Sequence, residues 1–257
     1  MTREKDDEKQ MSAVLRTINI LETLSECESS NLENLSRETE LPKATLLRFL
    51  SSLANLGYVY RDSADRYHLT LKMFSVGSRS LKYIDLVSTA RPFALELCKT
   101  LGETVHMGIP QDDYAVYVLK EESSYTLRMY SRIGKVIPLY CTAIGKIFLA
   151  EMGDEELRGY LERNPLKPYT AKSIRSEEAL REELERVKRR GYSVDDEEHE
   201  EQVMCIACPI KDYENKVVAA ISVSWPVFRF DRDDFENTVR LIRKTANKIS
   251  EILGYQE

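Results

Sequence analysis

Three polar side chains recur on one side of a segment that is otherwise apolar. In "LPKATLLRFL" and the residues that follow, Thr45, Arg48 and Ser52 share one face of a helix. Hydroxyl and guanidinium groups in such a row can donate hydrogen bonds to base edges and phosphates. The opposite side is apolar, and we expect it to pack on a core: it carries Leu46, Leu47, Leu50, Leu53 and Ala54. An exposed polar face usually meets only water, so the neighbouring elements must decide between these interpretations.

The segment "LYCTAIGKIFLA" is a candidate ligand-binding site, because a strand end passes there into a helix through small residues. Such residues let a ligand approach the backbone, and the amides of the first helical turn, with the helix dipole, favour a carboxylate. A close-packed helix start explains the same residues equally well. In "AAISVSW", Ala220, Ser222 and Ser224 share one face of a strand, while Ile221 and Val223 share the other. The two hydroxyls could bind a polar ligand or face solvent.

Other reactive residues carry weaker signals. The run "DDEEHEE" at residues 195–201 could bind a cation, although a solvated loop is the commoner structure. Cys205 and Cys208 form a C-x-x-C inside an expected strand, where residues three apart face opposite sides. We interpret His106, in "TVHMG", as a packed strand residue. The sequence has no G-x-S-x-G, P-loop, G-x-G-x-x-G or H-E-x-x-H motif. We therefore predict neither an enzyme nor a bound metal or cofactor.

The elements around the polar helix favour a DNA-binding unit. A first helix is expected over residues 12–25, with Val14, Ile18 and Leu21 on one face and Leu15 and Leu24 beside it. Ser30 and Glu33 have capping-box spacing, so a short second helix should start at Ser30 or Asn31 and bury Leu32 and Leu35. Pro42 falls in the first turn of the third helix, and Gly57 ends it. Two strands, 58–61 and 66–69, flank the turn "DSAD". This order is typical of a winged helix-turn-helix.

The local charge supports the same interpretation. The whole chain has a net charge of −6, but residues 41–82 contain seven basic and only two acidic residues. A local basic patch is what a DNA-binding face requires. We therefore predict that double-stranded DNA is contacted by Lys43, Thr45, Arg48, Ser52, Arg61 and Arg66.

The rest of the chain reads as a helical connector followed by an α+β domain. Residues 72–86 have a helical pattern, and Pro92 is expected to interrupt it before another helix that ends near Gly102. Short strands are expected at "TVHMGI", "YAVYVLKE", "TLRMYS", "VMCIACPIKD" and "VVAAISVSW", with a hairpin turn at "YENK". Helices are expected at "DEELRGYLER", at "SEEALREELERVKRRG" and over residues 231–253. Mixed strands and helices of this kind favour one antiparallel sheet.

A length of 257 residues allows two domains, each with its own core. The start, "MTREKDDEKQ", has no apolar segment behind it, so we predict no signal peptide and no membrane span. The five cysteines are odd in number and scattered, which favours reduced thiols and a cytoplasmic protein. The predicted organisation is a disordered tail (1–10), a winged helix-turn-helix (11–71), a linker helix (72–87) and a second domain (88–257).

This arrangement resembles the IclR family of bacterial transcription regulators over nearly the whole chain. The residues that carry the resemblance are "LPKATLLRFLSSLANLGYV", "GETVHMG", "LYCTAIGKIFLA", "GYSVDDEEHE", "CIACPI" and "AAISVSWP". Within the family, "LRMYSRIGKVIPLYCTAIGKIFLA" is similar to the branch that represses 2-keto-3-deoxygluconate and pectin catabolism. The resemblance implies a GAF-like effector-binding domain, homodimers or dimers of dimers, palindromic operators and small organic acids as effectors.

The resemblance also implies the effector site. It places effector contacts on the backbone around Ala143 and Ile144, makes Asp195 a hydrogen-bond acceptor, and puts three further side chains in the pocket. The three are Cys205, Ser222 and Ser224. With Cys141 and Thr142, which belong to the same passage from strand to helix, the predicted effector-binding set is Cys141, Thr142, Ala143, Ile144, Asp195, Cys205, Ser222 and Ser224. Related sequences often carry serine where this chain has Cys141, and "HEEQVM" departs from the usual small residues, so the polarity of the pocket is open. We expect a repressor of carbohydrate or sugar-acid catabolism that responds to an acid such as 2-keto-3-deoxygluconate. The alternatives are an activator that responds to another organic acid and a metal-responsive regulator.

Overall fold

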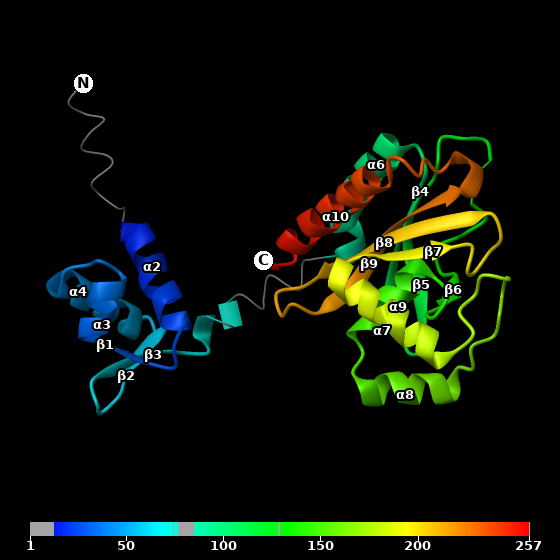
Figure 1. Ribbon diagram of the computed structural model, residues 1–257. Coiled ribbons are helices and arrows are strands. Elements are labelled where there is room, and N and C mark those ends of the chain that lie inside the picture. Colours follow the sequence, from blue (N-terminus) through cyan, green and yellow to red (C-terminus); the bar gives the residue numbers. More distant parts are fainter. Residues whose placement is uncertain (1–12, 74, 77–84, 128, 257) are drawn as a thin grey trace, which may run out of the picture. The chain divides into compact units, whose positions relative to one another are not determined.

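The computed structural model describes residues 13–256 except 74, 77–84 and 128, and divides into two compact units (Figure 1). The units are Met1–Ile84 and Asp85–Glu257. The predicted tail (1–10) lies outside the described residues. So do residues 74 and 77–84 of the predicted linker helix (72–87). Each unit is described separately below.

The first unit packs three helices on a small sheet. The helices are α2 (Ala13–Ser25), α3 (Leu32–Glu38) and α4 (Lys43–Asn55), and the antiparallel strands are β1 (Ser30–Asn31), β2 (Val59–Arg61) and β3 (Arg66–Leu69), in the order β1-β3-β2. The core comprises Ile20, Leu21, Leu24, Leu35, Leu41, Leu46, Leu50, Leu53, Val59 and Tyr67. The predicted order of three helices and a two-stranded wing is confirmed, and β1 adds a strand that the sequence reading missed.

Local hydrogen bonds explain why these elements begin and end where they do. The Asn31 side chain caps α3 by accepting from the amide of Asn34 at 2.9 Å, so Asn31 and not Ser30 is the capping residue. Ser30 belongs instead to β1, where it is buried. In the wing, Asp62 Oδ1 accepts from the amides of Ala64 and Arg66, both at 2.9 Å. This side chain closes the "DSAD" turn between β2 and β3.

Two predicted apolar faces are partly wrong. On α2 the buried residues are Ile20, Leu21 and Leu24, whereas Val14, Leu15 and Ile18 are 70%, 58% and 44% exposed. The helix packs on α3 and β3 only through its later turns, so the earlier apolar residues face away from this core. On α4 the expected Leu46, Leu50 and Leu53 are buried, but Leu47 and Ala54 are exposed, because they lie at the edge of the apolar stripe.

The second unit begins with α6 (Leu86–Leu101), which runs through Pro92 instead of stopping there. Asp85 caps the helix by accepting from the amide of Val87 at 3.0 Å, and Gly102 ends it with φ 74°. The prediction of an interruption at Pro92 is therefore wrong. Proline removes one hydrogen bond to the carbonyl of Ser88, and because Ser88 is exposed, water can replace that bond.

The second unit is built on one antiparallel sheet. Its strands are β4 (Thr104–Gln111), β5 (Tyr114–Glu121), β6 (Val136–Pro138), β7 (Ser193–Asp196), β8 (Val203–Lys211) and β9 (Val217–Pro226), in the order β6-β5-β4-β9-β8-β7. A strand was also predicted at "TLRMYS", but the described residues of 126–131 form a loop, and the edge of the sheet is β6. The predicted α+β class with an antiparallel sheet is confirmed.

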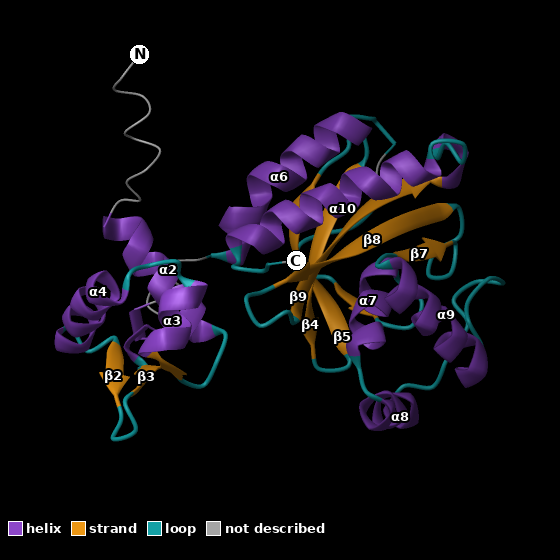
Figure 2. Ribbon diagram, turned by 60° about the vertical axis from the view of Figure 1, so that its left-hand side comes forward, coloured by secondary structure: helices purple, strands orange, loops and turns teal. Residues whose placement is uncertain are grey.

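Helices cover both faces of this sheet (Figure 2). One face carries α6 and α10 (Phe235–Ile252), and the short turn η1 (Val227–Arg229) leads from β9 toward α10. The other face carries α7 (Ala143–Glu151), with α9 (Glu177–Arg190) packed beside it and α8 (Asp154–Arg163) nearby. Among the described residues, no helix is long and apolar enough to cross a membrane.

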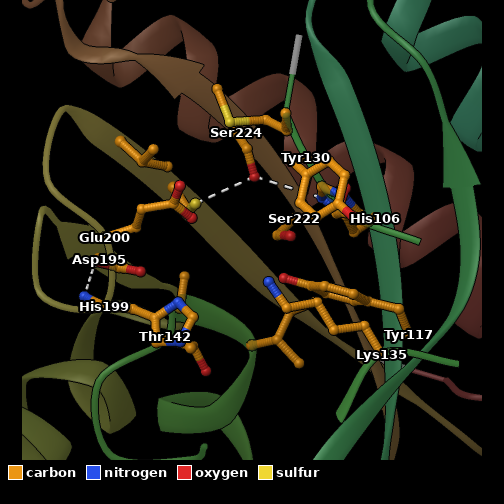
Figure 3. A pocket seen from close by; sticks show the side chains of 16 residues that line it. His106, Tyr117, Tyr130, Lys135, Thr142, Asp195, His199, Glu200, Ser222 and Ser224 are labelled. Atoms are coloured by element: carbon orange, nitrogen blue, oxygen red, sulfur yellow. Dashed lines mark hydrogen bonds between the residues drawn. The ribbon is translucent and has the colours of Figure 1, made fainter. Parts of the chain in front are cut away.

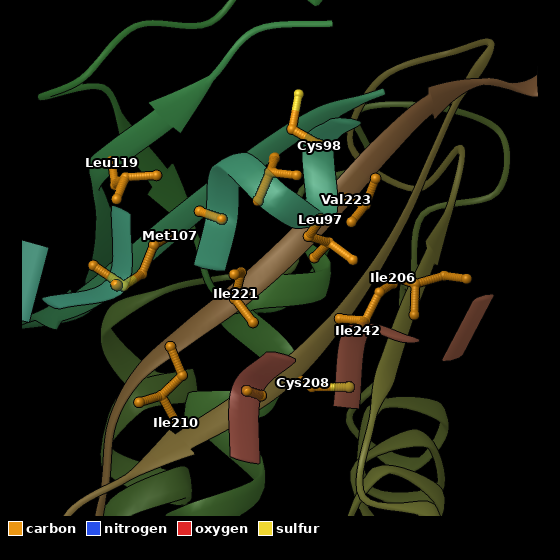
Figure 4. Packing of buried hydrophobic residues seen from close by; sticks show 14 of the residues in the cluster. Leu97, Cys98, Met107, Leu119, Ile206, Cys208, Ile210, Ile221, Val223 and Ile242 are labelled. Atoms are coloured by element: carbon orange, nitrogen blue, oxygen red, sulfur yellow. The ribbon is translucent and has the colours of Figure 1, made fainter. Parts of the chain in front are cut away.

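Strand alternation separates the residues of the two faces. Met107, Ile206, Cys208, Ile221 and Val223 point toward α6 and α10 and form one core (Figure 4). Their neighbours in sequence point the other way, toward α7, which is the behaviour predicted for Cys205 against Cys208 and for Ser222 against Ile221. The polar residues of the strands are thereby gathered on the α7 face.

Candidate functional site

A pocket opens on the α7 face of the sheet, with about 530 Å³ of space between protein atoms, part of it open to solvent (Figure 3). Seven of the predicted effector residues line it: Thr142, Ala143, Ile144, Asp195, Cys205, Ser222 and Ser224. Cys141, the eighth, is fully buried in the core beside α7 and does not line the pocket. Burial raises the pKa of the Cys141 thiol, so it is an inert packing residue.

Strand register brings the polar side chains of the wall into rows. Asp195 pairs with Cys205, Cys205 with Ser224, and Ser224 with Thr104, across β7, β8, β9 and β4. A second row joins Ala207 and Ser222 to His106. Cys205 Sγ donates to Ser224 Oγ at 3.1 Å, which holds one hydroxyl in place. The pocket wall is therefore a patch of neighbouring strands and not a single loop.

The start of α7 forms another side of the pocket. Thr142 caps the helix by accepting from the amide of Gly145 at 3.1 Å, and its hydroxyl donates to the carbonyl of Pro138 at 2.6 Å. The amides of Ala143 and Ile144 have no acceptor within the helix, because they belong to its first turn. Both residues line the cavity, so these amides and the helix dipole provide a site for an anion.

Asp195 faces the pocket from the end of β7. It is 4% exposed, and its Oδ1 accepts from the amides of Glu198 at 2.8 Å and His199 at 3.4 Å. Burial, followed by the charge of Glu198, raises the pKa of Asp195 to about 7. The acidic run is a solvated loop only in part: residues 195–199 are buried or half-buried, and residues 200–201 are exposed. Among the described residues, no cluster of three His, Cys, Asp or Glu could hold a metal.

A buried lysine supports this loop from behind. Lys146 is fully buried in α7 and forms a short ion pair with Glu198, with Glu183 of α9 3.9 Å away. Burial raises the pKa of Glu198. The sequence reading missed Lys146, although a lone lysine inside the apolar run "AIGKIFLA" was a visible signal. It holds the loop of Asp195 against α7.

His106 of β4 belongs to the same sheet wall, where it pairs with Ser222. Its ring stacks on Tyr117 with 4.5 Å between centroids, and Nε2 lies 2.6 Å from Ser131 Oγ while Nδ1 lies 3.4 Å from Ser224 Oγ. Burial, then the charges of Lys120 and Lys135, lowers the pKa of His106 to about 3, so the ring is neutral at pH 7. His106 is a packed strand residue, as predicted, and also part of the pocket wall.

The first unit presents a separate surface. Arg48 and Ser52 of α4 are exposed, and Thr45 is half-buried beside them. The guanidinium of Arg48 lies 5.7 Å from the ring centroid of Phe49, whereas the hydroxyl of Ser52 donates to the Arg48 carbonyl at 3.0 Å. Leu47, exposed next to Arg48, was expected in the core and instead adds an apolar group to this surface.

The predicted basic residues around α4 are exposed and engaged in weak contacts. Lys43 Nζ lies 3.6 Å from Glu33, and Arg61 Nη2 lies 3.0 Å from Asp65. Arg66 donates to the carbonyl of Ser29 at 3.0 Å. Exposed pairs of this kind contribute little to stability, so these side chains can exchange their partners for phosphates at small cost.

Comparison with known proteins identifies both units. The profile of the IclR helix-turn-helix domain matches residues 13–63, and that of the bacterial transcriptional regulator IclR C-terminal domain matches residues 78–251. The chain is 40% identical over 248 residues to the HTH-type transcriptional regulator KdgR of Escherichia coli K12, covering 96% of this chain and 94% of KdgR.

Solved structures agree with the sequence matches. The Agobacterium tumefaciens repressor BlcR superposes with a TM-score of 0.80 at 28% identity, over 95% of this chain and 98% of BlcR. The C-terminal domain of E. coli KdgR superposes with a TM-score of 0.61 at 37% identity, over 67% of this chain and all of that domain. The prediction that the chain is not an enzyme is confirmed, since these relatives are regulators. Two family profiles that together span most of the chain show that it belongs to the IclR family of bacterial transcriptional regulators.

Proposed function

We propose that this regulator represses genes of sugar-acid catabolism and is released from its operator by a small organic acid such as 2-keto-3-deoxygluconate. The observation that carries the proposal is the convergence of the α7 amides, Asp195, Ser222 and Ser224 on one pocket. The amides suit a carboxylate, and the hydroxyls suit the keto and hydroxyl groups of a sugar acid. Similarity to KdgR over nearly the whole chain supports this effector class.

On the DNA side, the regulator reads a palindromic operator in the bacterial cytoplasm through α4 and the wing. Arg48 is the side chain best placed to read a base edge, because it is exposed and long enough to enter the major groove. Lys43, Arg61 and Arg66 contact phosphates, while Thr45 and Ser52 complete the α4 surface.

Substitution of Arg48 tests the DNA side. We expect Arg48→Ala to weaken operator binding by about 1–3 kcal/mol, because a bidentate contact to guanine is lost. Lys43→Ala and Arg66→Ala should weaken binding to all DNA sequences equally. Each should reduce the slope of log affinity against log salt concentration by about one. Titration of operator DNA, identified by genome-wide mapping of bound sites, measures both effects. Equal affinities of Arg48→Ala and the parent protein would remove Arg48 from the interface.

Removal of the two pocket hydroxyls tests the effector side. The double variant Ser222→Ala/Ser224→Ala should bind operator as the parent does but respond less to 2-keto-3-deoxygluconate. The reason is that the keto and hydroxyl groups of the acid lose their hydrogen-bond partners. Thr100→Ala is the matched control, since it removes an exposed hydroxyl from α6 on the other face of the sheet. Operator titration with and without the acid gives the response. A double variant that responds like the parent would contradict the pocket assignment.

A further inference from the structure

One cation in the pocket was not among the predicted effector residues. Lys135 is half-buried and lines the cavity, and its side chain reaches into the pocket near Tyr117 (Figure 3). Among the described residues, its ammonium group forms no ion pair and no hydrogen bond. It is also the one Lys or Arg in the described lining, where Asp195 and Glu200 carry the acidic groups.

The backbone of Lys135 is held in a defined turn. The carbonyl of Lys135 accepts from the amide of Tyr117 at 3.1 Å, and the amide of Gly134 donates to the carbonyl of Tyr117 at 2.7 Å. The amide of Lys135 donates to the carbonyl of Arg132 at 3.1 Å. Gly134 has φ 83°, which glycine adopts without strain. The turn before β6 therefore fixes the point from which the Lys135 side chain enters the pocket.

The other lysines near the pocket are already neutralised or occupied. Lys120 Nζ donates to the carbonyls of Met129 and Ser131 at 3.2 and 2.8 Å and pairs with Glu122 at 3.2 Å. Lys146 pairs with Glu198. Within the described part of the chain, Lys135 has no such partner. Its charge acts within the pocket, because after burial it is the main group that lowers the pKa of His199. A half-buried ammonium without a counter-ion is an incomplete site for an anion.

We propose that Lys135 selects anionic effectors, its ammonium pairing with the carboxylate that the first turn of α7 also binds. The inference rests on the proposed function and adds to it the residue that distinguishes an acid from a neutral sugar. Without Lys135 the described lining would present the carboxylate of Glu200, and that of Asp195 whenever it is ionised, to an incoming anion with no Lys or Arg to oppose them. With Lys135 an incoming carboxylate meets one cation in the lining, which offsets the repulsion from these acidic groups.

Calorimetry on the full chain with 2-keto-3-deoxygluconate and with its neutral amide tests this inference. Lys135→Met keeps the length of the side chain and removes its charge. We expect Lys135→Met to bind the acid at least about tenfold more weakly, because a partly buried charge pair is lost, and to bind the amide as the parent does. Lys135→Arg should restore most of the affinity. The parent's affinity should fall with added salt more steeply than that of Lys135→Met.

Lys216→Met is the matched control, because Lys216 is an exposed lysine that pairs with Glu214 on the β8–β9 hairpin. It should bind both compounds as the parent does, and equal melting temperatures would show that all variants fold. If Lys135→Met binds the acid as tightly as the parent, Lys135 is not the selecting residue and the proposed function stands. If the parent itself binds neither this nor another sugar acid, both the inference and the proposed function are overturned.

Discussion

At the scale of single residues, the pocket joins groups whose charges depend on one another. Asp195 faces three residues of its own loop, Glu198, His199 and Glu200. From other elements it faces Lys146 of α7 and Cys205 of β8. Tyr117 and Lys135 line the same cavity. Burial and the charge of Glu198 favour the protonated carboxyl, whereas Lys146 and the two backbone amides favour the carboxylate. The first influence is larger, so the pKa of Asp195 is raised to about 7. A carboxyl with this pKa can donate a hydrogen bond to an anion at neutral pH.

Effector binding should therefore depend on pH. An anionic ligand binds better when Asp195 is protonated, so affinity is highest below about pH 7 and falls as pH rises through the pKa of Asp195, by up to about tenfold per unit. Asp195→Asn should flatten this dependence. His106 and His199 do not produce it, because their pKa values are lowered. Calorimetry from pH 6 to 8.5 gives the profile, and an affinity that is constant over this range would refute protonation of Asp195.

At the scale of elements, α7 is fixed by close packing within the second unit. All its residues from Ala143 to Ala150 are buried, and Ser193 of β7 forms a short hydrogen bond with the carbonyl of Ala143. Gly145 allows this close packing, because a Cβ there would lie 2.3 Å from backbone atoms of Leu139. The amides that we propose to bind an anion are thus placed by packing of the helix against the chain that precedes it.

Gly145→Ala should destabilise the second unit by about 3 kcal/mol or more, because the added methyl meets backbone atoms that no side-chain rotation can move. Gly159→Ala in α8 is the control. Its Cβ would meet only the end of the Arg163 side chain at 3.2 Å, and alanine favours a helix by up to about 1 kcal/mol. Thermal unfolding of the two variants gives the comparison. A Gly145→Ala protein that melts with the parent would show that the helix start can shift.

At the scale of the whole molecule, the regulator must connect effector binding to DNA affinity. An effector changes operator binding only if it prefers one of two arrangements, and a tenfold change requires about 1.4 kcal/mol of coupling. One recognition helix covers half a site, so a palindrome calls for a two-fold dimer or a dimer of dimers. We expect the helical connector over residues 72–86 to form the contact between the DNA-binding domains of two subunits, but residues 77–84 of it lie outside the described part of the chain.

We expect a homodimer in solution, with the exposed apolar residues of α2 contributing to its contact. Val14, Leu15 and Ile18 are unburied in the described unit, and a second copy would remove them from water. Leu15→Gln/Ile18→Gln should weaken self-association and operator affinity while leaving effector binding unchanged. Sedimentation at micromolar concentration with and without operator measures the first effect. A monomeric parent protein bound to the operator would contradict the dimer.

Periodicity alone was sufficient for the elements whose residues interact with near neighbours. The alternation of Ile221 and Val223 with Ser222 and Ser224 predicted which side of β9 is polar, and the helical spacing of α4 predicted Arg48 and Ser52 on its exposed side. These patterns are local, because side-chain direction in a strand or helix follows from backbone geometry. Within the winged helix-turn-helix, the helices and the two strands of the wing follow from the same reasoning.

Only the tertiary structure decided which distant residues meet. The register of β7, β8, β9 and β4 places Asp195, Cys205 and Ser224 in one row, and the turn before β6 brings Lys135 into the same cavity. Because α2 packs on its core only through its later turns, Val14 is exposed, and Cys141 is buried in the core beside α7 instead of lining the pocket. Such outcomes depend on the pairing of segments far apart in the chain, and no spacing within one segment records that pairing.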